Sequence, residues 1–250
     1  MVAWKLWSDT RFRFYIGVVV MIVCAFFMLW MYSSMTKLLH PTELPSNPKV
    51  SAQAQATIAK VTGNYQAFTD HTWYISAGGL VALLAIILTL GGPLTESHSA
   101  HLTLSLPVRR HQWPVVQALL MMGMVVAMLQ VSTAVFWAIS TLAGQVYPPG
   151  HAVVNALLCA VPCAAWIGLT LAVGSYALDK ARTALIMIPA KFLSFFVFTA
   201  SPRMKAWNIG NLGQPMSMQP AHPWRPLLLV IILSVGGVAL AARRFERLDY

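Results

Sequence analysis

The sequence contains few acidic residues and few cysteines. Aspartate and glutamate account for seven of its 250 residues, and none of the seven falls in the middle of a long apolar run. Carriers coupled to protons or sodium generally place ionisable groups near the bilayer midplane, so this absence argues against ion coupling. The three cysteines, Cys24, Cys159 and Cys163, lie in apolar stretches without a CxxC pair, which favours packing roles over a zinc site.

Sequence motifs for hydrolytic chemistry are also missing. The chain has no GxxxxGK[ST] phosphate loop, no HExxH pair and no GxSxG nucleophile elbow. His98 and His101 could share one helix face, but two histidines are weak evidence for a zinc site, which usually has four ligands. We therefore predict no catalytic residue, no metal site and no cofactor bound by this chain.

Apolar residues, in contrast, are abundant. Hydrophobic residues make up 58% of the chain and charged residues 10%, with a mean hydropathy of +0.65, which excludes an ordinary water-soluble domain. The formal net charge is +10, but the basic residues lie in short clusters beside apolar runs and not along one polar face. This placement favours contact with membrane lipids over nucleic acid.

Six apolar runs are long enough to cross the hydrocarbon core of a bilayer. They cover residues 14–32, 73–92, 115–143, 152–178, 183–200 and 226–242. The sequence therefore predicts an all-α, polytopic membrane helix bundle of about six transmembrane helices, with residues 1–250 forming a single transmembrane domain. Pro189 and Lys191 interrupt the fifth run, so five spans and a broken or re-entrant segment are the alternative.

The basic residues indicate the orientation of these helices. Short cytoplasmic loops collect lysine and arginine, and four basic clusters fall on one side of a six-helix bundle. We therefore predict that both termini are cytoplasmic, and that residues 33–72, 144–151 and 201–225 lie on the opposite side. The four clusters are Lys5, Arg11 and Arg13; Arg109 and Arg110; Lys180 and Arg182; and Arg243, Arg244 and Arg247.

Lys191 is the one ionisable residue well inside a predicted span. A charge within the membrane is a functional candidate by default, so Lys191 could contact an anionic substrate or headgroup on a substrate pathway. The alternative is that its side chain snorkels to the interface, or that the fifth segment sits higher in the membrane.

Residues 91–122, between the second and third predicted spans, begin too polar for lipid and then keep apolar residues at Leu102, Leu104, Leu106 and Val108. This pattern is typical of an amphipathic element at the membrane surface, which Arg109 and Arg110 would anchor at anionic headgroups. Such an element could dock a soluble partner or could simply connect two helices, and its periodicity does not decide between them.

The same stretch resembles the permeases of the type 2 ABC export family, whose second and third helices are joined by a cytoplasmic segment of the form E-x-x-x-G-T-L-x-L-L-L-S-L-P-V-S-R. The matching residues are Glu96, Leu102, Leu104, Ser105, Leu106, Pro107, Val108 and Arg109. The carboxyl end, AARRFERLDY over residues 241–250, resembles the family's basic, phenylalanine-containing finish.

The resemblance implies an exporter half-transporter in a bacterial cytoplasmic membrane. Two such permeases, identical or paired with a related subunit, would carry two separate cytoplasmic ABC ATPases that bind ATP and Mg. Glu96, Arg109 and Arg110 would contact the ATPase and couple its closure to the helices, although the positive-inside rule alone could account for the two arginines. The exported substrate would often be amphipathic or lipidic.

Two other functions stay open: a secondary carrier, and a membrane protein that confers immunity or organises a complex. Neither would need an ATPase partner. A membrane enzyme would need a reactive cluster, and the sparse polar residues offer none.

Overall fold

The computed structural model describes residues 2–38, 64–90, 112–177, 179–220 and 222–247, and these residues form helices and turns without a strand. Six helical runs among them are long and apolar enough to cross a membrane, which confirms the predicted all-α membrane bundle. They are Trp4–Ser34, Tyr65–Thr89, Gln112–Leu142, Pro149–Ala177, Lys180–Phe198 and Trp224–Glu246. The fifth run is one continuous helix through Pro189, so the alternative of a broken fifth segment is wrong.

The first two spans are longer than the apolar runs that predicted them. Helix α1 (Val2–Leu38) includes the basic residues that precede the apolar run. The second span joins α3 (Tyr65–Phe68), the π-helical turn η1 (Thr69–Tyr74) and α4 (Ile75–Thr89) end to end. It begins at Tyr65 and not at residue 73, because the Asn64 side chain caps it by accepting a 2.9 Å hydrogen bond from the backbone N–H of Gln66.

Short connections join the next three spans to one another. Helix α6 (Gln112–Leu142) ends two residues before Gly144, whose φ of 74° is the left-handed conformation that closes many helices. Helix α7 (Pro149–Ala177) follows. Helix α8 (Lys180–Thr199) begins directly after α7, with the Asp179 carboxylate accepting a 3.0 Å hydrogen bond from the Ala181 N–H.

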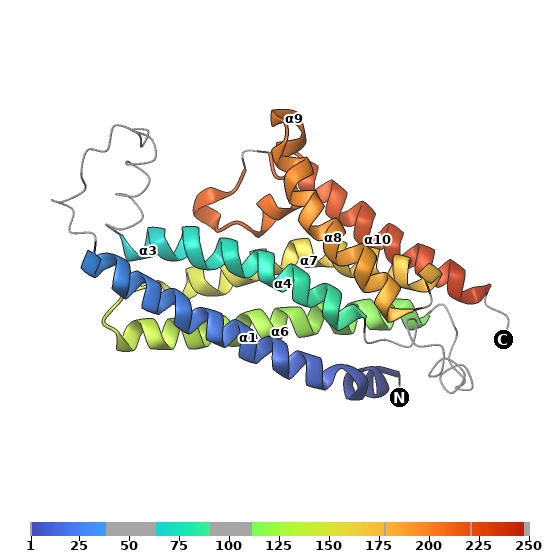
Figure 1. Ribbon diagram of the computed structural model, residues 1–250, viewed down its shortest axis with the longest axis horizontal. Helices are drawn as coiled ribbons and strands as arrows, with labels where there is room; N and C mark the ends of the chain where they lie inside the picture. The colour runs from blue at the N-terminus through green and yellow to red at the C-terminus, as the bar shows by residue number, and fades with distance from the viewer. Residues whose placement is uncertain (1, 39–63, 91–111, 178, 221, 248–250) are drawn as a thin grey trace.

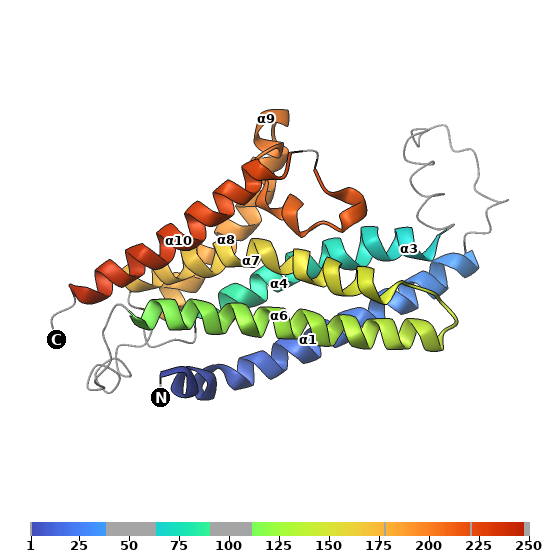
Figure 2. The ribbon, with the colours of Figure 1, turned by 180° about the vertical axis from the view of Figure 1, so that it is seen from behind.

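Between α8 and the last helix the chain turns back onto the bundle. Helix α9 (Pro202–Lys205) is followed by two 3₁₀ turns, η3 (Ile209–Gly213) and η4 (Met216–Met218), and then by α10 (Trp224–Glu246). We call residues 206–219 the return segment. It packs against α4 and α7 through η3, along the upper edge of the bundle in Figures 1 and 2.

Both described ends of the chain lie at the same end of the bundle (Figure 1). Helices α1, α6 and α8 begin there, and α4, α7 and α10 end there, so we call it the basic end after the residues it gathers. Its described basic residues are Lys5, Arg11, Arg13, Lys180, Arg182, Arg243, Arg244 and Arg247. Arg13 joins two of these helices by donating a 3.2 Å hydrogen bond to the Ile87 carbonyl.

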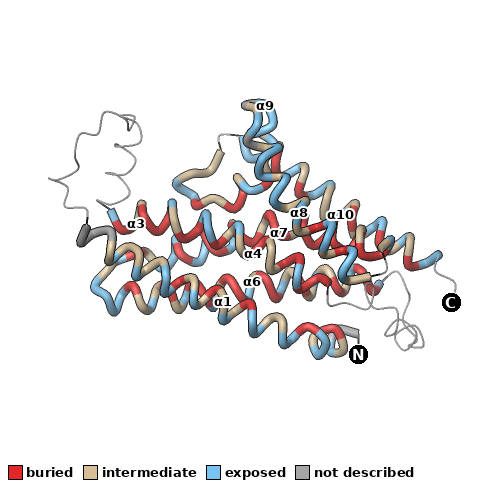
Figure 3. Tube along the Cα trace, viewed as in Figure 1, coloured by how far each residue is buried: buried red, intermediate tan, exposed pale blue. Residues whose placement is uncertain are grey.

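Helix α7 lies at the centre of the bundle (Figure 3). It packs against α4, α6, α8 and α10, whereas α1 packs against α6 and α4. Two thirds of the apolar stretch of α7 is buried, compared with about a tenth of that of α8, which lies at the periphery. Without a hydrophobic driving force between helices in lipid, this packing depends on close fit.

The closest fit joins α7 to α10 through two glycines. A Cβ atom added to Gly168 would lie 2.6 Å from the Leu233 carbonyl oxygen, and one added to Gly237 would lie 2.3 Å from the Gly168 carbonyl oxygen. Because both obstacles are backbone atoms, the two helices touch directly, as small residues allow in membrane helix pairs.

Replacing Gly237 by alanine is therefore expected to destabilise the protein by about 1–3 kcal/mol, the usual cost of overpacking. Gly236→Ala is the matched control, because an added Cβ there meets no atom within 4 Å. Thermal unfolding of both variants in mild detergent measures the effect. Equal unfolding temperatures for the two variants would contradict the direct contact of α7 and α10.

Candidate functional site

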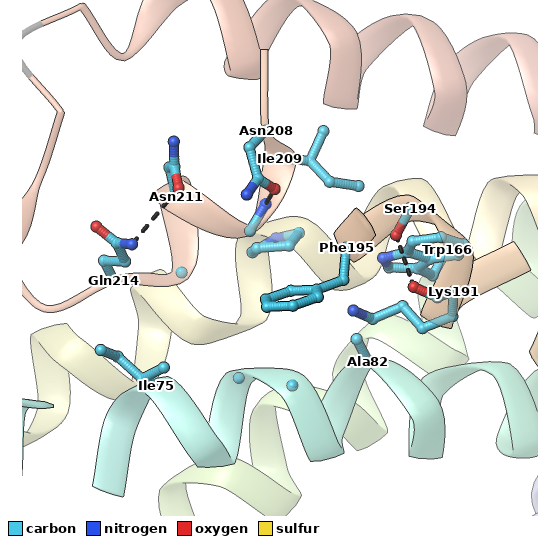
Figure 4. A pocket seen from close by; sticks show the side chains of 15 residues that line it. Ile75, Ala82, Trp166, Lys191, Ser194, Phe195, Asn208, Ile209, Asn211 and Gln214 are labelled. Atoms are coloured by element: carbon cyan, nitrogen blue, oxygen red, sulfur yellow. Dashed lines mark hydrogen bonds between the residues drawn. The ribbon is translucent and has the colours of Figure 1, made fainter. Parts of the chain in front are cut away.

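A cavity of about 260 Å³ lies between α4, α7, α8 and the return segment (Figure 4). Small residues of α4 form one wall, since Gly78, Gly79 and Ala82 leave space beside the helix. A Cβ added to Gly79 would meet no atom within 4 Å. The other lining residues are Ile75, Pro162, Trp166, Lys191, Ser194, Phe195, Asn208, Ile209, Gly210, Asn211, Gly213 and Gln214.

Lys191 reaches this cavity from α8. Its Nζ lies 5.4 Å from the centroid of the Trp166 ring of α7, within the range of a cation–π contact. The neighbouring Phe192, Leu193 and Phe196 are exposed on the outer face of the same helix. The side chain of Lys191 is thus half-buried and lines the cavity between α8, α7 and α4. Whether it serves a substrate pathway stays a prediction.

Neutral amides line the part of the cavity that the return segment contributes. The Asn208 side chain accepts a 2.9 Å hydrogen bond from the Gly210 N–H, and Asn211 donates a 3.0 Å hydrogen bond to the Lys205 carbonyl. Gln214 donates to the Asn211 side-chain oxygen at 3.4 Å (Figure 4). These hydrogen bonds fix the three amide side chains within one short loop. The amides make this part of the cavity polar without adding charge.

A buried carboxylate, Asp70 of η1, fixes the far end of the return segment. Its side chain is 4% exposed, and its Oδ1 accepts hydrogen bonds from the Tyr147 hydroxyl at 2.6 Å and the Asn155 amide at 3.3 Å. Its Oδ2 accepts a 2.8 Å hydrogen bond from the Ser217 hydroxyl of the return segment. Three donors thus satisfy a group that would be costly to bury alone.

Two partners of Asp70 reinforce this arrangement. Burial, together with the adjacent Asp70 carboxylate, raises the pKa of Tyr147, so its hydroxyl stays protonated at neutral pH and can donate. Asn155 donates to the Tyr147 oxygen at 2.8 Å and accepts a 3.0 Å hydrogen bond from the Met216 N–H. The amide of Asn155 therefore links α7 to both the carboxylate and the return segment.

The middle of the return segment is held by α7 as well. The Cys159 thiol, buried completely, donates a 3.2 Å hydrogen bond to the Gly213 carbonyl. A Cβ added to Gly213 would lie 3.1 Å from Pro162 Cγ, so the loop and the helix are in tight contact. The packing role predicted for Cys159 agrees with this position.

The predicted ATPase-coupling residues Glu96, Arg109 and Arg110 lie outside the described residues, as do His98 and His101. The described residues on either side of them, Leu90 and Gln112, both lie at the basic end (Figure 1). Within the described part of the chain, histidine, cysteine, aspartate and glutamate form no group that could hold a metal ion.

Sequence reasoning missed Asp70. It placed residues 33–72 outside the membrane helices, whereas Tyr65–Tyr74 form the first turns of the second span and bury this carboxylate. One signal was present, because Asn155 is an isolated amide within a predicted span and such a group needs a polar partner.

The fold and the site define a polytopic helical membrane protein with one cation in a cavity between its helices and one carboxylate in a buried polar cluster. Comparisons with protein-family models, curated proteins and solved structures give no match.

Replacing Asp70 by alanine is expected to release the return segment, because the carboxylate that binds Ser217 and orients Asn155 is lost. In a chain carrying Cys24→Ala and Cys163→Ala, a membrane-permeant maleimide should then label Cys159 roughly tenfold faster, as expected for the loss of one charge-assisted hydrogen bond.

Asp179→Asn serves as the control, because this aspartate lies at the basic end and contacts α8. An unchanged labelling rate in Asp70→Ala would show that the carboxylate does not hold the segment.

Proposed function

We propose that this chain is the transmembrane permease subunit of an ATP-driven exporter of the type 2 ABC class. It works as one half of a dimer with an identical or related permease. Two separate cytoplasmic ATPases bind ATP and Mg, and the chain itself hydrolyses nothing. The exporter resides in the cytoplasmic membrane of a bacterium.

The observation that carries the proposal is that one end of the bundle gathers eight of the thirteen described lysines and arginines, both described chain ends and both flanks of residues 91–111 (Figure 1). Under the positive-inside rule this end is cytoplasmic. The segment that resembles the ATPase-facing element of the export family is then attached on the face where an ATPase would bind. Six spans and two cytoplasmic termini also match the outline of that family.

The arrangement of the helices supports a route from this end to the cavity. Residues 91–111 connect α4 to α6, and α4 forms the glycine-containing wall of the cavity beside Lys191. A displacement of α4 driven by an ATPase would change the cavity directly. A helix pair with two arrangements, biased by nucleotide, is the physical form that such coupling takes.

Affinity purification of the tagged chain in mild detergent tests the proposal. A soluble ATPase should co-purify in roughly equal amount, as one permease per ATPase requires, and its turnover should be sensitive to vanadate. Purification of the chain without any ATPase would contradict the exporter proposal.

Substitution of Glu96 tests the coupling role. A Glu96→Ala permease should assemble with the ATPase and yet fail to stimulate its turnover, because the charged contact that transmits movement is absent. Glu246→Ala is the matched control, since it removes the same side chain at the same end of the bundle. Normal stimulation by Glu96→Ala would reject this role, and we expect Arg109→Gln and Arg110→Gln to resemble Glu96→Ala.

A second candidate is an ion-coupled secondary carrier, and the observation that favours it is Asp70. Its buried carboxylate supplies an ionisable group of the kind that sequence reasoning found missing from the spans. Transport by a carrier would persist without ATP and would stop when the proton or sodium gradient is dissipated. Transport by the proposed exporter would stop without ATP and would persist when the proton or sodium gradient is dissipated.

A further inference from the structure

The cavity carries one positive charge, and no acidic residue of the described part of the chain lines it. Lys191 is the only charged member of the described residues that line it, and no ion pair with Lys191 occurs among the described residues. Its Nζ has the Trp166 ring as its neighbour, which stabilises a cation without neutralising it. A charge in this position favours an anion beside it, because opposite charges attract strongly where water is scarce.

The walls that α4 and α8 contribute are suited to an apolar group, whereas the return segment contributes amides. Gly79 and Ala82 leave room along α4, and Ile75 and Phe195 contribute apolar side chains (Figure 4). Phe195 is 61% exposed and so also belongs to the outer face of α8, next to the exposed Phe192 and Phe196. The cavity thus borders a helix face that lies against lipid, and a chain bound inside can continue along that face.

We propose that this cavity binds an anionic amphiphile, with its charged head beside Lys191 and its apolar chain between Gly79 and Phe195. Two sources share this chemistry, a membrane lipid with an anionic headgroup and a free single-chain amphiphile such as an alkyl phosphate. The proposal rests on the proposed function in one respect: if the chain is an exporter, the bound molecule represents the class of substrate that it exports.

Binding is measured on the purified chain in an uncharged maltoside detergent, without ATPase. The probes are brominated phosphatidylglycerol and brominated phosphatidylcholine, which quench nearby tryptophan. The contribution of Trp166 is obtained as the difference between the parent chain and Trp166→Phe. Phosphatidylglycerol should quench it at a roughly tenfold lower mole fraction than phosphatidylcholine, the effect of one charge-assisted contact.

Two kinds of variant separate the effect of the Lys191 charge from the effect of the cavity volume. Lys191→Gln should remove the preference for phosphatidylglycerol, and Lys191→Arg should keep it. Gly79→Leu fills the cavity without changing its charge and should abolish quenching of Trp166 by both lipids. Lys205→Gln and Gly123→Leu are the matched controls, because neither residue lines the cavity and a Cβ at Gly123 meets no atom within 4 Å.

Competition identifies the source of the amphiphile. Reversal of quenching by dodecyl phosphate would show that a free single-chain molecule enters, and its failure to compete would assign the site to a membrane lipid. Reversal by inorganic phosphate at the same concentration would overturn the proposal, because the apolar chain would then contribute nothing. Equal quenching by the two brominated lipids would overturn it as well.

Native mass spectrometry provides a second measurement that does not use Trp166→Phe. The parent chain should retain one more phosphatidylglycerol than Lys191→Gln, and equal retention would contradict the proposal. A bound amphiphile without a co-purifying ATPase would leave this inference standing while rejecting the exporter, so the two failures can be told apart.

Discussion

The structure depends on one face of α7. Asn155, Cys159, Pro162 and Trp166 follow one another at steps of four, three and four residues, so they lie along a single stripe of the helix. Three of them contact other parts of the chain: Asn155 binds Asp70 and Met216, Cys159 binds Gly213, and Trp166 faces Lys191. At Gly168 the contact with α10 depends instead on the absence of a side chain, because the backbones of the two helices touch there. A shift of α7 would disturb all of these contacts together.

The sequence was sufficient to predict the bundle but not the ends of its helices. Long apolar runs have one stable solution in lipid, because a spanning helix satisfies its own backbone. Where polar residues begin, that argument stops, and α1 and α3 both continue into polar sequence. The start of α3 depends on a single Asn64 cap, which composition does not reveal.

The candidate site was predicted in part, for a related reason. Lys191 could be recognised from its position in an apolar run, since a charge there needs an explanation. The face of α8 that it occupies, and Trp166 as its neighbour, depend on how two helices dock. Asp70 is bound by residues 147, 155 and 217, which lie 77 or more residues from it in the chain, so no local sequence pattern predicts the cluster. The Gly79 wall is equally a product of tertiary packing.

A molecule could enter the cavity past the return segment or past α8, and these two routes differ in the hydrogen bonds that entry would break. Its residues 208–214 line the cavity, while Met216 and Ser217 bind Asn155 and Asp70, so the segment cannot leave as a unit without breaking those bonds. Each buried polar group left without a partner costs about 1–3 kcal/mol, and more for a charge. On the α8 side the cavity is bordered by Phe195, whose side chain is 61% exposed. A molecule that enters from the membrane along α8 therefore leaves the Asp70 cluster intact, whereas entry by displacement of the return segment disrupts it.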